Sequence, residues 1–215
     1  MLYDKLIFPK RALTVILLSM LSMGFLSVSA ARKKPVQKIK VACVGNSITY
    51  GTGIQDREHF SYPVQLQNML GDKYLVGNFG KPGATLLNHG HRPYMQQEEY
   101  KQAMAFKGDI AVIHLGINDT DPRNWPNYRD EFVKDYLSLM DSLRSANPKV
   151  RFILACMTPI ADRHPRFISG TKQWHDEIQE AIKVVARVSG AELIDFHAPL
   201  YPYPNLLPDA IHPNA

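Results

Sequence analysis

Five short apolar runs that alternate with segments of helical spacing constrain the fold of this chain more than any other feature. The runs cover residues 39–45, 74–79, 109–115, 150–157 and 191–196. The third run, Asp-Ile-Ala-Val-Ile-His-Leu, is nearly continuous in apolar residues, which is typical of a strand covered on both faces. Strands that alternate with helices predict an α/β protein with a five-stranded parallel sheet and helices on both of its sides.

Helix signals fill the intervals between the runs, and we expect helices over residues 61–71, 94–106 and 171–190. Asn127 is expected to cap a further, long helix that Asn147 and Pro148 stop. Because crossovers between parallel strands are right-handed, every strand-to-helix loop then lies along one edge of the sheet. Polar groups that converge on that edge are expected to form the functional site.

The turn after the first strand carries the candidate nucleophile. The strand breaks at Gly45, and Ser47 follows two residues later in a turn rich in Gly, Asn and Thr. A strand that feeds a tight turn is how α/β enzymes hold a reactive side chain at the carboxyl edge of a sheet. Asn46 and Ser47 also suit an ordinary helix cap, and this stretch alone favours that interpretation.

A carboxylate and an imidazole stand close together near residue 215. Asp209 and His212 are three residues apart, which a helical turn brings onto one face, and Pro213 ends such a turn at His212. A carboxylate at imidazole Nδ1 leaves Nε2 free to take a proton from a serine. The alternative is a capping Asp beside a surface His.

Two further polar positions follow strands. Gly80 comes just after the second strand, where its N–H can approach a ligand closely. Asn118 follows the third strand and offers a side-chain N–H₂ group. An ordinary Gly-Pro-Gly turn and an Asx-turn explain these residues equally well when each is taken alone.

Together these stretches resemble the GDSL-type SGNH hydrolase family. Its four blocks occur in order over residues 39–214, as Gly45-Asn46-Ser47-Ile48-Thr49, Gly80, Gly116-Ile117-Asn118-Asp119 and Asp209-x-x-His212-Pro213. The resemblance implies a flavodoxin-like, three-layer α/β/α sandwich with strand order 2-1-3-4-5.

The resemblance also implies roles for individual residues. Ser47 would be the nucleophile, His212 the base and Asp209 its orienting partner. The oxyanion hole would comprise the backbone N–H groups of Ser47 and Gly80 and the amide of Asn118. No cofactor and no metal are implied.

The sequence departs from the family pattern at two places. Asn46 stands where the name motif has Asp, although relatives also carry Asn there. The family continues past the His-Pro-Asn block with a closing helix, whereas this sequence stops at Ala215. We therefore expect that the natural protein is longer than this sequence. The hydrolase domain, residues 39–215 here, would be followed by that helix, and a second catalytic domain could come after it.

The first forty residues predict export. Residues 1–30 have the basic, apolar and small-residue regions of a secretory signal peptide, which favours a periplasmic or secreted protein without a membrane span after cleavage; an uncleaved anchor is the less favoured alternative. Residues 31–38 form a basic tether. Residues 41–215 carry a net charge of −2 despite the formal +5 of the whole chain, so nothing indicates a nucleic-acid partner.

The two cysteines, Cys43 and Cys156, fall in separate strands and are expected to be buried free thiols. His89 and His91 have no third ligand at a metal-binding spacing and are expected in a surface loop. His114, inside the third strand, is expected to be a hydrogen-bonded core residue.

The predicted reaction is hydrolysis of an ester through an acyl-enzyme. The resemblance favours removal of O-acetyl groups from carbohydrate, with O-acetylated sialic acid as the sharpest guess. The alternatives are a lysophospholipase or thioesterase and a non-catalytic glycan-binding module. Candidate substrate contacts are Asn46, Thr49, Arg92, Tyr201 and Tyr203. The sequence does not indicate an oligomeric state.

Overall fold

The computed structural model describes residues 37–215, so the predicted signal peptide and most of the basic tether lie outside the described residues. The strands are β1 (Ile39–Gly45), β2 (Tyr74–Gly80), β3 (Ile110–His114), β4 (Arg151–Cys156) and β5 (Glu192–Asp195). The helices are α2 (Ser47–Tyr50), α3 (Arg57–Phe60), α4 (Tyr62–Leu70), α5 (Glu98–Phe106), α6 (Trp125–Tyr128), α7 (Phe132–Ala146), α8 (Pro165–Ile168) and α9 (Lys172–Ser189). Short 3₁₀ turns are η1 (Tyr94–Gln96), η2 (Ile117–Thr120), η3 (Arg129–Glu131) and η4 (Pro204–Leu206).

All five strands run parallel in the order β2-β1-β3-β4-β5. β1 therefore has neighbours on both sides, with Gly45 opposite Gly80 of β2 and His114 of β3. This register brings the ends of three strands, and the loops that follow them, to one edge of the sheet. The predicted fold class and strand order are confirmed.

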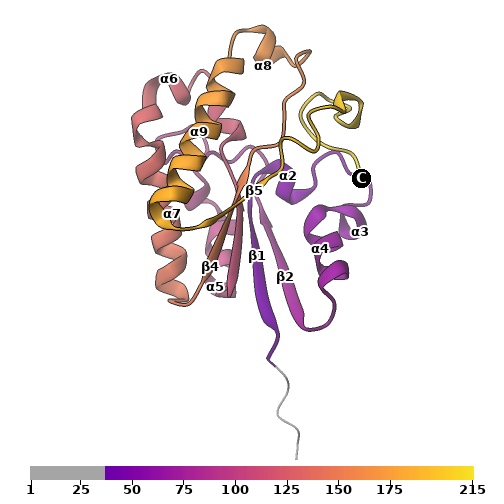
Figure 1. The fold of residues 1–215 in the computed structure, drawn as a ribbon, viewed down its shortest axis with the longest axis vertical. Coiled ribbons are helices and arrows are strands. Elements are labelled where there is room, and N and C mark those ends of the chain that lie inside the picture. The colour runs from indigo at the N-terminus through magenta and orange to yellow at the C-terminus, as the bar shows by residue number, and fades with distance from the viewer. Residues whose placement is uncertain (1–36) are drawn as a thin grey trace, which may run out of the picture. The chain divides into compact units, whose positions relative to one another are not determined.

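The two faces of the sheet are covered differently (Figure 1). On one face, strand residues such as Val44, Ile113 and Leu154 form the main core with apolar residues of α5, α7 and α9. On the other face, Val41 and Cys43 pack against Leu66 of α4. An apolar groove of about 730 Å³ continues from α4 along β3, β4 and β5 to the loop after β5. It also reaches Ile48 and Pro213, which adjoin Ser47 and His212 in the sequence.

Most helix boundaries follow the sequence signals. α4 begins after Ser61 and ends at Gly71, and α7 ends at Ala146 before Asn147. One prediction was wrong: Asn127 does not cap the long helix but lies inside the short α6, and α7 starts only at Phe132. The side-chain amide of Asn127 donates instead to the carbonyl groups of Pro122 and Arg123 behind it, which closes a local turn.

Both cysteines are buried free thiols, as expected. Cys43 lies on β1 and Cys156 on β4, and β3 stands between these strands. Burial raises the pKa of the Cys43 thiol to about 12, so it behaves as a small apolar side chain.

His114 is the hydrogen-bonded core histidine that the sequence predicts. Its side chain has no exposed surface, and its Nε2 accepts the backbone N–H of Thr158 at 3.2 Å. Burial, and to a lesser degree the nearby His175, lowers the pKa of His114 to about 4. The folded protein therefore holds this ring neutral.

Glycines let the turn after β1 fold back onto the sheet. A Cβ on Gly45 would stand 2.0 Å from Thr49 Oγ1, and one on Gly80 would stand 2.2 Å from the backbone nitrogen of Tyr50. Backbone atoms cannot yield as a flexible side chain can. Gly80 is therefore required for the close packing of β2 on α2, the element that carries Ser47.

We predict that Gly80→Ala destabilises the protein by about 3 kcal/mol, the upper end of the usual cost of overpacking, because the added Cβ would meet backbone atoms of α2. Gly190→Ala is the matched control, because its added Cβ would meet nothing within 4 Å. Only the strain of an alanine at positive φ should then lower the stability, by about 1–2 kcal/mol. Urea unfolding measures both. Equal losses for the two variants would contradict the packing argument.

We also predict that the stability of the protein falls in mild acid through His114. An unfolded histidine has a pKa near 6.5 and the folded His114 about 4, so between these values the unfolded chain binds a proton that the folded chain excludes. Stability from this group is complete above pH 6.5 and declines by up to about 3 kcal/mol as the pH falls toward 4. His114→Gln should have a flatter dependence of unfolding free energy on pH; parallel curves would contradict the assignment.

Candidate active site

Ser47 is held at the carboxyl edge of the sheet by a short turn and helix. Asn46 ends the turn after β1, and its Oδ1 accepts the backbone N–H of Ile48 at 3.0 Å. Ser47 begins α2, so its own N–H belongs to the first turn, where a helix has no internal acceptor. Gly51, at φ 92°, ends the helix after a single turn. The serine thus lies at a helix start, as the alternative helix-cap interpretation expected, and also at the edge of the sheet where the strand loops meet.

His212 meets Ser47 across 165 residues of sequence. The Nε2 atom of His212 lies 2.8 Å from Ser47 Oγ, and its Nδ1 lies 2.5 Å from Asp209 Oδ2. Because a carboxylate only accepts hydrogen bonds, Nδ1 carries the proton and Nε2 accepts from the serine hydroxyl. The Ser47 side chain is almost buried, at 5% exposed.

An Asx-type turn, rather than the helical turn suggested by the spacing, brings Asp209 to His212. Asp209 Oδ1 accepts the backbone N–H groups of Ile211 at 3.1 Å and of His212 at 2.7 Å, which leaves Oδ2 for the ring. Ala210 between them adopts φ 72°, which is unusual for a residue with a side chain. Burial alone would raise the pKa of Asp209, but the hydrogen bonds from the His212 ring and from these N–H groups outweigh it and hold the pKa below its ordinary value.

The segment that carries Asp209 and His212 is tied to the loop after β4. The backbone N–H of Ala161 donates to the carbonyl of Ala210 at 2.8 Å, and Ala161, Leu207 and Ala210 form a small buried cluster. The guanidinium of Arg163 donates to the carbonyl of Leu207. These contacts fix the segment at the sheet edge.

Gly80 is the last residue of β2, and Asn118 follows β3, the strand on the other side of β1. The N–H of Gly80 donates to Oδ1 of Asn78 at 3.0 Å, so this expected oxyanion donor already has an acceptor in its own chain. Asn118 lies in η2, and one hydrogen of its Nδ2 group donates to the carbonyl of Ala84 at 2.9 Å. The second hydrogen of that amide remains for a ligand.

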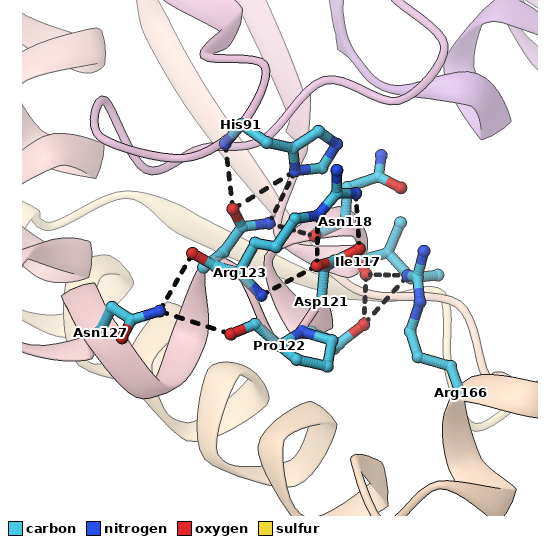
Figure 2. Close-up of polar contacts among 10 residues, drawn as sticks. His91, Ile117, Asn118, Asp121, Pro122, Arg123, Asn127 and Arg166 are labelled. Carbon is cyan, nitrogen blue, oxygen red and sulfur yellow. Dashed lines mark hydrogen bonds and ion pairs between the residues drawn. The ribbon is translucent and has the colours of Figure 1, made fainter.

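A network of polar side chains supports the backbone around Asn118 (Figure 2). Asn124 donates through Nδ2 to the carbonyl of Asn118 at 2.9 Å, while its Oδ1 accepts the backbone N–H of His91 at 3.0 Å. Arg166 donates to the carbonyl of Ile117 at 3.0 Å. Sequence reasoning missed both Asn124 and Arg166, because each supports η2 from a position that no motif or spacing links to it.

Of the residues expected to contact the substrate, two are buried and three are exposed. Asn46 and Thr49 have no exposed surface, and Thr49 Oγ1 shares a hydrogen bond with the hydroxyl of Tyr62, so neither side chain is open to a ligand. Tyr201 and Tyr203 are 59% and 54% exposed in the loop before Asp209. Arg92 is exposed and donates to the carbonyl of Pro82.

Nothing in the described part of the chain has the geometry of a metal centre, in the sense of three or more His, Cys, Asp or Glu side chains gathered together. Among residues 37–215, no helix is both long and apolar enough to cross a membrane.

The chain is similar to known esterases over most of its length. The chain is 42% identical over 193 residues to a protein named acetylxylan esterase from Xylanibacter ruminicola; the match takes in 82% of this chain and 40% of the relative, so the chain spans well under half of that protein's length.

Solved structures show the same fold at low identity. An acetyl xylan esterase, AlAXEase, matches 82% of this chain and 92% of its own with a TM-score of 0.60 at 21% identity. Est24, a carbohydrate acetylesterase from Sinorhizobium meliloti, matches 74% of this chain and 84% of its own with a TM-score of 0.54 at 19% identity. The family model of GDSL-like lipases and acylhydrolases matches residues 43–215, and the chain belongs to that family.

Proposed function

We propose that this chain is a serine esterase that removes O-acetyl groups from carbohydrate. The observation that carries the proposal is the contact between Ser47 Oγ and His212 Nε2, continued from His212 Nδ1 to Asp209. This is the geometry in which an imidazole can take the serine proton while a carboxylate holds the ring in the required tautomer.

In the proposed reaction, Ser47 Oγ attacks the acetyl carbonyl carbon as its proton passes to His212 Nε2. His212 then gives that proton to the sugar oxygen, and the C–O bond breaks to release the alcohol. A water molecule attacks the acetyl-enzyme in the same way, with His212 again as base, and acetate leaves. Asp209 stays ionised because its pKa is held low, and it stabilises the imidazolium formed in each step.

The proposed oxyanion donors are the N–H of Ser47 and the free N–H of the Asn118 side chain. Such donors, aimed at the developing negative charge, are usually the largest single contribution to catalysis. Gly80 is a third donor only when its N–H turns from Asn78 Oδ1 toward the ligand. We therefore assign the larger share to Asn118.

The proposed natural substrate is acetylated xylan, with O-acetylated sialic acid as the competing ester. Two relatives named for acetylxylan or acetyl xylan support the first, including the one at 42% identity. Tyr201 and Tyr203, exposed in the loop before Asp209, offer flat faces on which a sugar ring can stack. The predicted leader supports action outside the cytoplasm.

A second candidate is hydrolysis of esters with longer acyl chains, such as lysophospholipids or thioesters. The observation that favours it is the apolar groove of about 730 Å³, which reaches Ile48 and Pro213 beside the two reacting side chains. An acyl chain could enter this groove from Ser47.

We predict that Ser47→Ala lowers kcat on p-nitrophenyl acetate by about 10³-fold or more, because the nucleophile is lost. Asn118→Ala should lower kcat by about 10²–10³-fold. The exposed Ser145 serves as a matched control, and Ser145→Ala should act like the wild type. A fluorophosphonate probe should label the wild type and not the Ser47 variant; an unlabelled wild type would favour a glycan-binding module instead of an enzyme.

We further predict that acetate is released from acetylated xylan faster than from O-acetylated sialic acid, and that activity on p-nitrophenyl esters falls as the acyl chain lengthens from acetate to octanoate. Acetate release from a panel of both glycans and hydrolysis rates across the ester series measure these preferences. Activity that rises with acyl chain length would favour the long-chain ester candidate. Faster release of acetate from O-acetylated sialic acid would make that glycan, and not xylan, the proposed substrate.

A further inference from the structure

A buried carboxylate that the proposed reaction does not use lies next to Asn118. Asp119 has no exposed surface and lies in η2. Its Oδ2 accepts the backbone N–H of Leu86 at 2.9 Å, and its Oδ1 accepts that of Leu87 at 2.9 Å. Burying a carboxylate is costly unless hydrogen bonds satisfy it, so two such bonds to consecutive residues hold the loop firmly against η2.

The loop that Asp119 holds also carries the acceptor for Asn118. The carbonyl of Ala84, two residues before Leu86, accepts one hydrogen of Asn118 Nδ2 at 2.9 Å. Asn118 and Asp119 thus form a closed ring of contacts with residues 84–87, in which the carboxylate fixes the loop and the loop fixes the amide. The ring determines which way the amide faces, because an amide turned over would present its oxygen to the Ala84 carbonyl.

The other side of η2 is fixed independently. Arg166 donates to the carbonyl of Ile117 (Figure 2), and Asn124 donates to the carbonyl of Asn118. The backbone that carries Asn118 is therefore held by these two side chains, and what remains to be set is the orientation of its amide. That orientation depends on Ala84, and hence on Asp119.

We propose that Asp119 is a positioning residue for the oxyanion amide: by holding residues 86 and 87 it places the Ala84 carbonyl, which orients the Asn118 amide so that its second N–H faces the reacting carbonyl oxygen. The inference rests on the proposed esterase function. Asp119 touches neither the substrate nor the reacting atoms and acts only through Asn118.

The same loop offers a matched control. Asp135 on α7 is also nearly buried, at 7% exposed, and its Oδ2 accepts the backbone N–H of Asn88 at 2.8 Å. It therefore holds the same loop by the same kind of bond, but four residues from Ala84. Asp135→Asn should disturb the loop as Asp119→Asn does, without displacing the Ala84 carbonyl that orients the Asn118 amide.

The test is a double-mutant cycle on kcat for p-nitrophenyl acetate. Asp119→Asn keeps the shape of the side chain but turns an N–H₂ group toward one of the two backbone donors, and it should lower kcat by about 10–100-fold with little change in KM. In an Asn118→Ala background the same substitution should change kcat by less than about threefold, because the amide it positions is gone. Asp135→Asn should lower kcat by less than about threefold in either background.

Equal losses from Asp119→Asn in both backgrounds, or losses matched by Asp135→Asn, would show a general structural role and overturn the proposal. Ser47→Ala is measured alongside: if it retains activity, the esterase function itself fails, whereas an inactive Ser47 variant beside a fully active Asp119→Asn protein refutes only the positioning role. If Asp119→Asn does not fold, nuclear magnetic resonance of the wild type decides. The proposal requires a slowly exchanging Asn118 side-chain proton and protected Leu86 and Leu87 amides, and rapid exchange at these sites would refute it.

Discussion

The hydrogen bond between Ser47 and His212 depends on both ends of the described chain reaching the same edge of one sheet. Ser47 follows β1, the second strand in the sheet order, and His212 lies in the segment beyond β5, the strand at the far edge of the sheet. The loop after β4 holds this segment in place through Ala161 and Arg163. The geometry of the site is therefore a property of the whole domain.

The carboxyl edge of the sheet is where this protein gathers its buried polar groups. Side chains with no exposed surface there are Asn46, Thr49, Thr85, His114, Asp119, Thr120 and Asn124. Each makes at least one hydrogen bond within the domain, although Asn46 Nδ2 and His114 Nδ1 have no partner among the described residues. Breaking such a bond leaves a desolvated group unpaired, which keeps these side chains in place. A rim of this kind suits a catalyst that must aim dipoles at a developing charge without reorganising.

Close packing is the second condition of the site. β2 can lie against α2 only because Gly80 has no side chain, and α2 can fold back on β1 only because Gly45 has none. Gly80, which was expected to offer its N–H to a ligand, is thus required because it has no side chain. Its N–H donates to Oδ1 of Asn78. The steric role and the chemical role of a glycine are separate, and a motif alone does not distinguish them.

Much of the fold follows from sequence patterns with a simple physical basis. Apolar runs of strand length and amphipathic helices between them determine an α/β sheet, and Asn147 and Gly71 mark helix ends because of their backbone preferences. The family blocks also singled out Ser47, Asp209 and His212, since the residue types and their order carry that information. Local signals failed at Asn127, where a turn satisfied the side chain that was expected to cap a helix.

Only the tertiary structure decided how these residues meet. The Asx-type turn at Asp209, the enclosure of Asn46 and Thr49, and the support of η2 by Asn124 and Arg166 all arise from contacts between residues distant in sequence or from backbone geometry that no spacing reveals. A sequence determines which side chains are available and which segments prefer to be strands or helices. Burial, and the partner that satisfies each buried polar group, are set only when those segments pack together.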